Sequence, residues 1–144
     1  MDYTYKSAMK VNLKRVNEAF HYEALTTDKI KVNIDANPAI GGEGKGTRPM
    51  ELLLMGVASC ASIDLGLILK KQKQKLLDHE VEVTASRNDN VAKTFKAINL
   101  HFILWGDLDS SKVERAIELT LTKYCSVALS LDKEIEITTT FTIK

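Results

Sequence analysis

PMELLLMGVASCASIDLGLILKKQKQK, residues 49–75, is the stretch of the chain that decides its fold. Proline suits the first position of a helix because its missing N–H needs no partner there, and Glu51 suits the positive end of the helix dipole. The sequence predicts a long helix that is apolar on nearly every side up to Leu69 and then becomes basic. A helix that is apolar all round must be buried all round. One small domain can hardly enclose about five such turns, so we expect a second chain to bury part of this helix.

Strand patterns precede this helix. Apolar and polar side chains alternate, partly or clearly, within residues 3–14, 19–25 and 29–35. Residues 36–48 then hold four of the seven glycines and one of the two prolines. These features predict an antiparallel N-terminal meander followed by a mobile or irregular loop.

The second half of the chain also contains patterns of strands and of one helix. Residues 79–87 and 96–106 alternate as two strands with a turn around residues 88–90, and residues 134–143 predict a final strand. Between them, Asp109, Ser110 or Ser111 can cap a helix over residues 112–124. The order of strands, long helix, strands, helix and strand is typical of an α+β fold with a largely antiparallel sheet.

Composition narrows the class of protein. The chain has 144 residues, 44% of them hydrophobic, and a formal net charge of +1. We expect one domain over residues 1–144, and no electrostatic attraction to nucleic acid. Residues 50–69 carry Glu51 and Asp64 and are a poor membrane span, and the first residues lack a signal-peptide pattern. The sequence therefore predicts a cytoplasmic protein without a membrane or nucleic-acid partner, whose two cysteines are free thiols.

The two cysteines are the residues best suited to chemistry: Cys60 lies in the middle of the long helix and Cys125 just after the second one. Three interpretations are open. They can be inert core residues, since free cysteine packs as a small hydrophobe. They can bind a metal, although the chain has no CxxC pair and its histidines stand singly on strand-like segments, at His21, His79 and His101. They can be a redox pair, in which the Cys60 thiolate attacks an oxidant and Cys125 then forms a disulfide with it.

A redox role requires that the pKa of Cys60 be lowered, and a nearby cation is the expected means. The helix supplies no cation within a turn of Cys60, and Asp64, four residues later, would oppose ionisation if it faces the sulfur. A cation must come from elsewhere in the chain, and Arg48 and Arg15 are the candidates. Each of these arginines can also be an ordinary surface salt-bridge residue.

Two runs carry a family resemblance: TRPMELLLMGVASCASID, residues 47–64, and KYCSVA, residues 123–128, resemble the OsmC/Ohr superfamily of osmotically induced and organic hydroperoxide resistance proteins. The combination is a proline with Cys60 eleven positions later, and a second cysteine after the second helix. The resemblance implies an OsmC-like fold with a long central cysteine-bearing helix, in an intertwined homodimer. It also implies a peroxidase that reduces organic hydroperoxides, with Cys60 as the peroxidatic and Cys125 as the resolving cysteine. An external dithiol would reduce the resulting disulfide, and no metal or organic cofactor is implied.

The chain departs from the best-studied branch of this superfamily, in which a glutamate directly follows the proline and pairs with an arginine from the N-terminal strands. Here Met50 follows Pro49, and Glu51 comes one place later. Glu51 precedes Cys60 by nine residues, about 13 Å along an unbroken helix. Contact between them would need a break, for example near Gly56, or a Glu51 from the second subunit. Glu51 is therefore both a candidate site residue and a candidate helix-start residue.

Two other functions remain open at this stage. The fold can bind a small hydrophobic or acyl ligand without peroxidase turnover. Cys60 can also serve as the nucleophile of a hydrolase or transferase, although the order of residues suggests no Cys-His-Asp triad.

Overall fold

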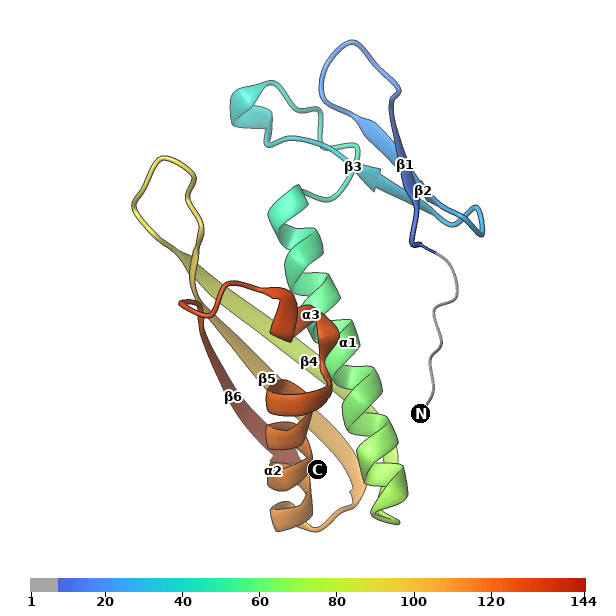
Figure 1. Cartoon of the computed structure of the whole chain (residues 1–144), viewed down its shortest axis with the longest axis vertical. Coiled ribbons are helices and arrows are strands. Elements are labelled where there is room, and N and C mark those ends of the chain that lie inside the picture. Colours follow the sequence, from blue (N-terminus) through green and yellow to red (C-terminus); the bar gives the residue numbers. More distant parts are fainter. Residues whose placement is uncertain (1–7) are drawn as a thin grey trace. The chain divides into compact units, whose positions relative to one another are not determined.

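The structure is a computed structural model that describes residues 8–144. The chain forms two compact units, divided between Leu53 and Leu54. The helix α1, Pro49–Lys71, contains this division, so its first turn belongs to the first unit and the rest to the second. Each unit is described by itself (Figure 1).

The first unit holds the predicted meander. Strands β1 (Val11–Arg15), β2 (Tyr22–Thr26) and β3 (Lys31–Ile34) form a sheet in the order β1-β2-β3. Both neighbouring pairs are antiparallel, which confirms the prediction for this part of the chain. Residues 3–7 of the first predicted strand lie outside the described residues.

The glycine-rich loop, residues 36–48, is irregular but is held by one buried side chain. The Asp35 carboxylate accepts hydrogen bonds from the backbone N–H groups of Ala36, Glu43 and Lys45 at 2.7, 3.1 and 3.0 Å. The Lys45 N–H, together with those of Glu43 and Ala36, lowers the pKa of Asp35 even though burial raises it. A Cβ atom at Gly42 would overlap the Ala36 carbonyl, so glycine is required there. The sequence predicted a mobile or irregular loop, and the structure shows an irregular loop whose backbone is held by these hydrogen bonds.

Helix α1 begins where the sequence predicts. The Glu51 carboxylate accepts hydrogen bonds from the Arg48 backbone N–H at 2.9 Å and from the Thr47 hydroxyl at 3.0 Å. This arrangement satisfies a backbone donor that the first turn of a helix leaves free. The helix ends at Lys71 and not near residue 75, because Lys73 adopts a positive φ of 57° and β4 begins at Lys75.

The second unit has a three-stranded sheet in the order β4-β5-β6, with β4 at Lys75–Arg87, β5 at Phe95–Asp107 and β6 at Glu136–Ile143. β4 and β5 form the predicted antiparallel hairpin. β6 runs parallel to β5, which is the exception to the largely antiparallel sheet predicted from the sequence. The reason is the connection between them, which crosses over through helices and brings the chain back to run in the same direction.

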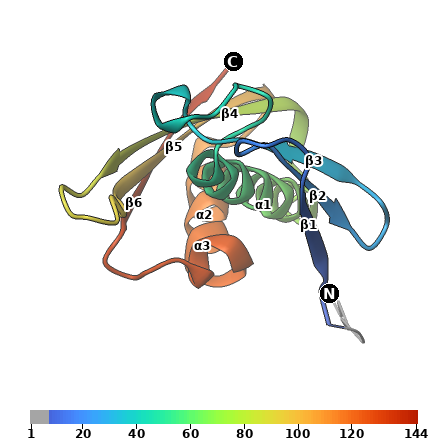
Figure 2. The same ribbon diagram turned by 90° about the horizontal axis from the view of Figure 1, so that it is seen from above.

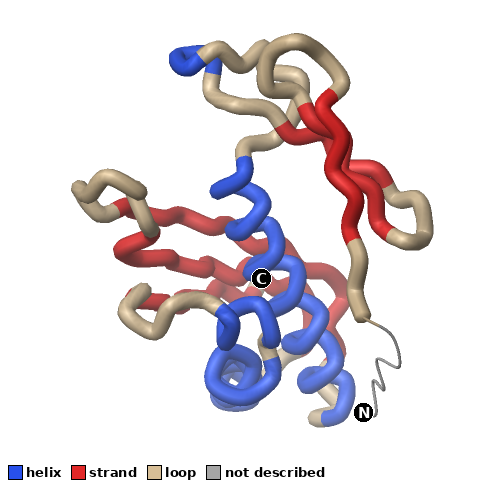
Figure 3. Tube along the Cα trace, turned by 45° about the horizontal axis from the view of Figure 1, so that its top comes forward, coloured by secondary structure: helices blue, strands red, loops and turns tan. Residues whose placement is uncertain are grey.

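That crossover contains the second predicted helix, divided into an α-helix and a π-helical turn, and then a short helix that the sequence did not predict. α2 spans Ser110–Leu119 and is capped by Asp109, whose carboxylate accepts from the Lys112 N–H at 3.0 Å, as predicted. A π-helical turn follows at Thr120–Tyr124, and the short helix α3 spans Ser126–Ser130. Figures 2 and 3 show α1 and α2 on the same side of the β4-β5-β6 sheet.

The core of the second unit lies between this sheet and the helices. Three elements supply its buried side chains: alternate residues of β5, residues of α1 spaced four apart, and one face of α2. These are Ile98, Leu100, Phe102 and Leu104 from β5, Val57, Ala61, Leu65 and Leu69 from α1, and Val113, Ala116 and Ile117 from α2. The sheet and helices therefore cover only one side of α1, as expected for a helix on a sheet.

The other sides of α1 keep their apolar character without cover from this unit. Met55 and Ile63 are 53% and 63% exposed. By length and composition alone, α1 could cross a membrane, because an 18-residue window of it has a mean hydropathy of 2.1. The share of that window that is buried inside the structure is 22%. The helix thus carries much more apolar surface than the β4-β5-β6 sheet and α2 can bury.

Candidate active site

The two cysteines are brought together by the packing of α3 against α1 within the second unit. Cys60 lies in the middle of α1 and is partly buried, whereas Cys125 lies between the π-helical turn and α3 and is fully buried. Gly56, one turn before Cys60, lies beside Val127 of α3: a Cβ atom there would lie 3.6 Å from Cγ1 of Val127, an ordinary van der Waals contact. A residue no larger than alanine at position 56 therefore leaves room for the start of α3 over the helix.

The side chains of the two cysteines and Asp64 form a tight cluster. The Cys60 Sγ, the Cys125 Sγ and a carboxylate oxygen of Asp64 all lie within 4.8 Å of one another. The Cys60 Sγ lies 4.0 Å from Oδ2 of Asp64 and 3.7 Å from Oγ of Ser126. Both cysteines are free thiols, and a shift of a few ångströms would bring their sulfurs to the disulfide distance of about 2.05 Å.

The surroundings shift the pKa values of the two thiols in opposite directions. Burial raises the pKa of Cys60, but hydrogen bonds from the Val127 backbone N–H, the Cys125 thiol and the Ser126 hydroxyl outweigh it, so that the pKa lies below the ordinary thiol value. Burial raises the pKa of Cys125 to about 11. Cys60 is thus suited to be the thiolate nucleophile, and Cys125 to stay protonated.

Asp64 faces the sulfur of Cys60, as its spacing of four residues on one helix allows. Its negative charge raises the pKa of Cys60, and burial raises the pKa of Asp64 itself. Within residues 8–144, Asp64 forms no ion pair with a lysine, arginine or histidine. Within the second unit, this carboxylate is therefore not compensated by a cation.

The predicted arginines belong to the first unit, not to the unit that carries the cysteines. Arg15 is the last residue of β1 and Arg48 directly precedes α1, and both are exposed. Their roles beside Cys60 stay predictions. Within the second unit, a set of neutral donors lowers the pKa of Cys60.

Glu51 has a structural task at the helix start, where it accepts from Thr47 and Arg48. These hydrogen bonds, the Arg48 N–H first, lower the pKa of Glu51. α1 is unbroken at Gly56, so the helix break that would bring Glu51 to Cys60 of the same chain is absent.

Two donors of the site were not predicted from the sequence: the Ser126 hydroxyl and the Val127 backbone N–H. Both follow Cys125 directly, where the chain leaves the π-helical turn and starts α3. Cys125 is itself the cap of α3, and its Sγ accepts from the Ala128 N–H at 3.4 Å. A cysteine in the cap position of a helix would have been the sequence signal, because the N–H groups of a first turn point toward the residues before it.

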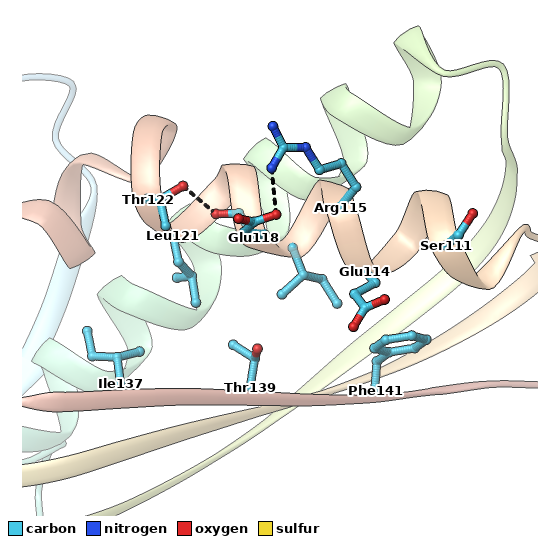
Figure 4. Close-up of a pocket in the computed structure, with 10 residues that line it drawn as sticks. Ser111, Glu114, Arg115, Glu118, Leu121, Thr122, Ile137, Thr139 and Phe141 are labelled. Carbon is cyan, nitrogen blue, oxygen red and sulfur yellow. Dashed lines mark hydrogen bonds and ion pairs between the residues drawn. The ribbon is translucent and has the colours of Figure 1, made fainter.

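A separate groove of about 540 Å³ lies between α2 and β6 in the same unit. Figure 4 shows Ile137, Thr139 and Phe141 pointing from β6 toward α2, with Glu114 over Phe141. Arg115 and Glu118 on the rim form an ion pair at 2.6 Å. The lining of this groove contains neither cysteine, so it is distinct from the thiol cluster.

Comparisons with known proteins agree with this architecture. The family model for OsmC-like protein matches residues 42–140. Protein YhfA of Escherichia coli strain K12 is 43% identical over 100 residues, which cover 69% of this chain and 75% of that protein. An organic hydroperoxide resistance protein-like 1 of Staphylococcus epidermidis is 31% identical over 83 residues, covering 58% of this chain and 59% of that one.

Solved structures show the same fold. The crystal structure of an OsmC-like protein from Mycoplasma pneumoniae superposes with a TM-score of 0.81 at 22% identity, and the match covers 99% of both chains. The predicted α+β, OsmC-like fold is thereby confirmed.

Proposed function

Because this chain belongs to the OsmC-like protein family, we propose that it is a thiol-dependent peroxidase that reduces organic hydroperoxides through Cys60 and Cys125. One observation carries the proposal. The two sulfurs lie within 4.8 Å of each other, and the pKa of Cys60 is lowered while that of Cys125 is raised to about 11. A nucleophilic thiolate beside a protonated thiol is the arrangement that a two-cysteine peroxidase needs.

The proposed cycle has three steps. The Cys60 thiolate attacks the terminal oxygen of ROOH, the O–O bond breaks, and the alcohol ROH leaves after taking up a proton. Cys60 is then a sulfenic acid, which the Cys125 thiol attacks; a disulfide forms and water leaves. An external dithiol reduces this disulfide by thiol–disulfide exchange and becomes a disulfide itself.

The proposed substrate class and cellular compartment rest on the surroundings of Cys60 and on the proposed cycle. Apolar side chains at Val57 and Ile63 lie within one turn of Cys60 on α1, which favours an organic hydroperoxide over hydrogen peroxide. A cycle that ends in reduction by a dithiol requires a reducing compartment, and we place the protein in the cytoplasm. The net charge of +1 supports no nucleic-acid partner, and we propose that α1 meets protein and not lipid.

The protein partner that we propose for α1 is a second copy of the chain. Met55 and Ile63 leave an apolar strip of α1 exposed, although the opposite stripe is fully buried. A closed twofold contact between two such helices would bury both strips at once. The homodimer is thus the simplest way to cover this helix.

The decisive experiment is turnover of cumene hydroperoxide and hydrogen peroxide by the reduced protein with a dithiol present. We expect the organic hydroperoxide to be consumed faster. Cys60→Ser should abolish consumption, whereas Cys125→Ser should allow the first turnover and then accumulate sulfenic or sulfinic acid at Cys60. Folded protein with both thiols free that consumes no peroxide would contradict the proposal.

The groove between α2 and β6 supports a second candidate function, binding of a small hydrophobic or acyl ligand. Its apolar floor at Ile137 and Phe141 and its charged rim at Arg115 and Glu118 suit an amphipathic molecule. A fatty acid that protects the protein against thermal unfolding, and does so less in Phe141→Ala, would support this function. Equal peroxidase activity in that variant would separate it from the thiol site.

A further inference from the structure

We propose that the reduced thiol site binds one zinc-class divalent cation through the Cys60 sulfur, the Cys125 sulfur and the Asp64 carboxylate. The sequence predicted no metal site, because it has no CxxC pair and no paired histidines. The fold assembles the donors from positions that no short motif connects. This inference does not require peroxidase activity, although its consequence for catalysis rests on the proposed function.

The distances fit a small tetrahedral cation. Zinc binds thiolate sulfur at about 2.3 Å and carboxylate oxygen at about 2.1 Å, so donors in a tetrahedral site lie roughly 3.5–3.8 Å from each other. Here Cys60 Sγ and Asp64 Oδ2 are 4.0 Å apart, and all three donor atoms lie within 4.8 Å of one another. Shifts of about 1 Å or less, which rotation of side chains on a fixed backbone can supply, would close the donors onto the metal.

The donors also suit this cation by chemistry and charge. Two thiolates and a carboxylate are a set that selects zinc-class metals over magnesium or calcium, which prefer oxygen ligands alone. The Asp64 carboxylate has no cationic partner within the second unit, residues 54–144. A divalent cation would supply the compensating charge and would displace the proton that each thiol carries, with no change of oxidation state.

The scaffold holds the donors in place before any metal arrives. Cys60 and Asp64 lie on one face of α1, four residues apart, and Cys125 is fixed at the start of α3 with no exposed surface. Three protein ligands leave one position of a tetrahedron open. The Ser126 hydroxyl, 3.7 Å from Cys60 Sγ, lies beside the cluster and can hydrogen-bond a water in that position.

Metal binding and disulfide formation exclude each other, because both use the same two sulfurs. If the proposed function holds, a bound zinc ion blocks the attack on peroxide, and peroxide acts only on metal-free protein. The cation would then be an inhibitor that responds to the redox state of the site.

The test is anaerobic titration of the full-length reduced protein with Co²⁺, whose absorption reports tetrahedral geometry and thiolate ligation. We expect saturation at one equivalent with sulfur-to-cobalt charge-transfer bands, and loss of these bands when Zn²⁺ is added. Asp64→Asn keeps both thiols but removes a ligand, and should weaken binding by about 100-fold or more, since even outer-shell changes cost 10–100-fold. Asp107→Asn removes the same charge from an exposed position at the end of β5 and should bind like the wild type.

Two results would overturn the proposal: Co²⁺ spectra without thiolate bands, or equal affinities for the wild type and Asp64→Asn. A measurement on the wild type alone provides a second test, since one equivalent of Zn²⁺ should protect both thiols from iodoacetamide. Unchanged alkylation rates with zinc present would also refute it. Cobalt binding in a protein that turns over no peroxide would leave the metal site standing and refute only the proposed function.

Discussion

Replacement of Asp64 by asparagine should make Cys60 more reactive, not less. The carboxylate Oδ2 lies 4.0 Å from Cys60 Sγ, and its negative charge raises the pKa of that thiol. Asparagine has nearly the same shape, carries no charge and offers an N–H donor that favours the thiolate. The change therefore removes an unfavourable interaction of the reactive form without removing a sulfur.

The distance sets the size of the effect. Two unit charges 4.0 Å apart repel by about 1 kcal/mol in water and by about 4 kcal/mol at an effective dielectric constant of about 20. Cys60 is partly exposed, so we take the lower figure. At a pH where the thiol is mostly protonated, about 1 kcal/mol corresponds to about fivefold more thiolate.

The assay is alkylation by iodoacetamide in a Cys125→Ser background, where Cys60 is the remaining cysteine. We expect the rate near neutral pH to rise about fivefold in Asp64→Asn, and its pH profile to shift toward acid. Asp107→Asn in the same background controls for the change in net charge and should leave the rate unchanged. An equal or lower rate in Asp64→Asn, with the fold intact, would show that the carboxylate does not act on the sulfur.

The same variant should be more stable than the wild type at neutral pH. Burial raises the pKa of Asp64 in the folded protein, so the ionised carboxylate destabilises the fold once the pH exceeds the pKa of the unfolded chain. The stabilisation by asparagine should therefore fade as the pH falls through the raised pKa of the folded protein, and it should be absent below the pKa of the unfolded chain. Urea unfolding at two pH values measures this, and an advantage that grows in acid would contradict the assigned direction.

Three further changes test the fold around the site. Leu65→Ala removes a fully buried side chain of α1 and should lower the free energy of unfolding by about 2–5 kcal/mol; a loss below about 1 kcal/mol in urea unfolding would contradict its core position. Gly56→Leu should push the start of α3 away and slow disulfide formation, whereas Gly56→Ala should not, because its Cβ atom would meet Val127 at an ordinary 3.6 Å. Ile63→Lys places a charge on the exposed strip of α1 and should dissociate the proposed dimer in sedimentation velocity; a wild type that sediments as a monomer would refute the dimer.

The sequence by itself determined the local features of this protein. Pro49, the cap formed by Glu51 and the run of apolar residues place the start of α1, and Asp109 marks the start of α2. Alternation of apolar and polar residues identifies the strands of both sheets. These features are readable because capping and side-chain periodicity depend on residues within one or two turns of each other. Even the contact of Asp64 with Cys60 follows from the four-residue spacing on one helix.

Only the tertiary structure decided what surrounds the reactive sulfur. Cys125 is 65 residues from Cys60 in the sequence, and no local pattern fixes the packing of α3 over Gly56 that brings the two within reach. The same holds for the parallel pairing of β6 with β5, which depends on where the crossover returns the chain. The sequence suggested an arginine as the group that lowers the pKa of Cys60, and that role stays a prediction; within the second unit the packing supplies a backbone N–H, a thiol and a hydroxyl from the start of α3. Neutral donors of this kind act only at contact distance, so their effect depends on three-dimensional packing and not on which residue types the chain contains.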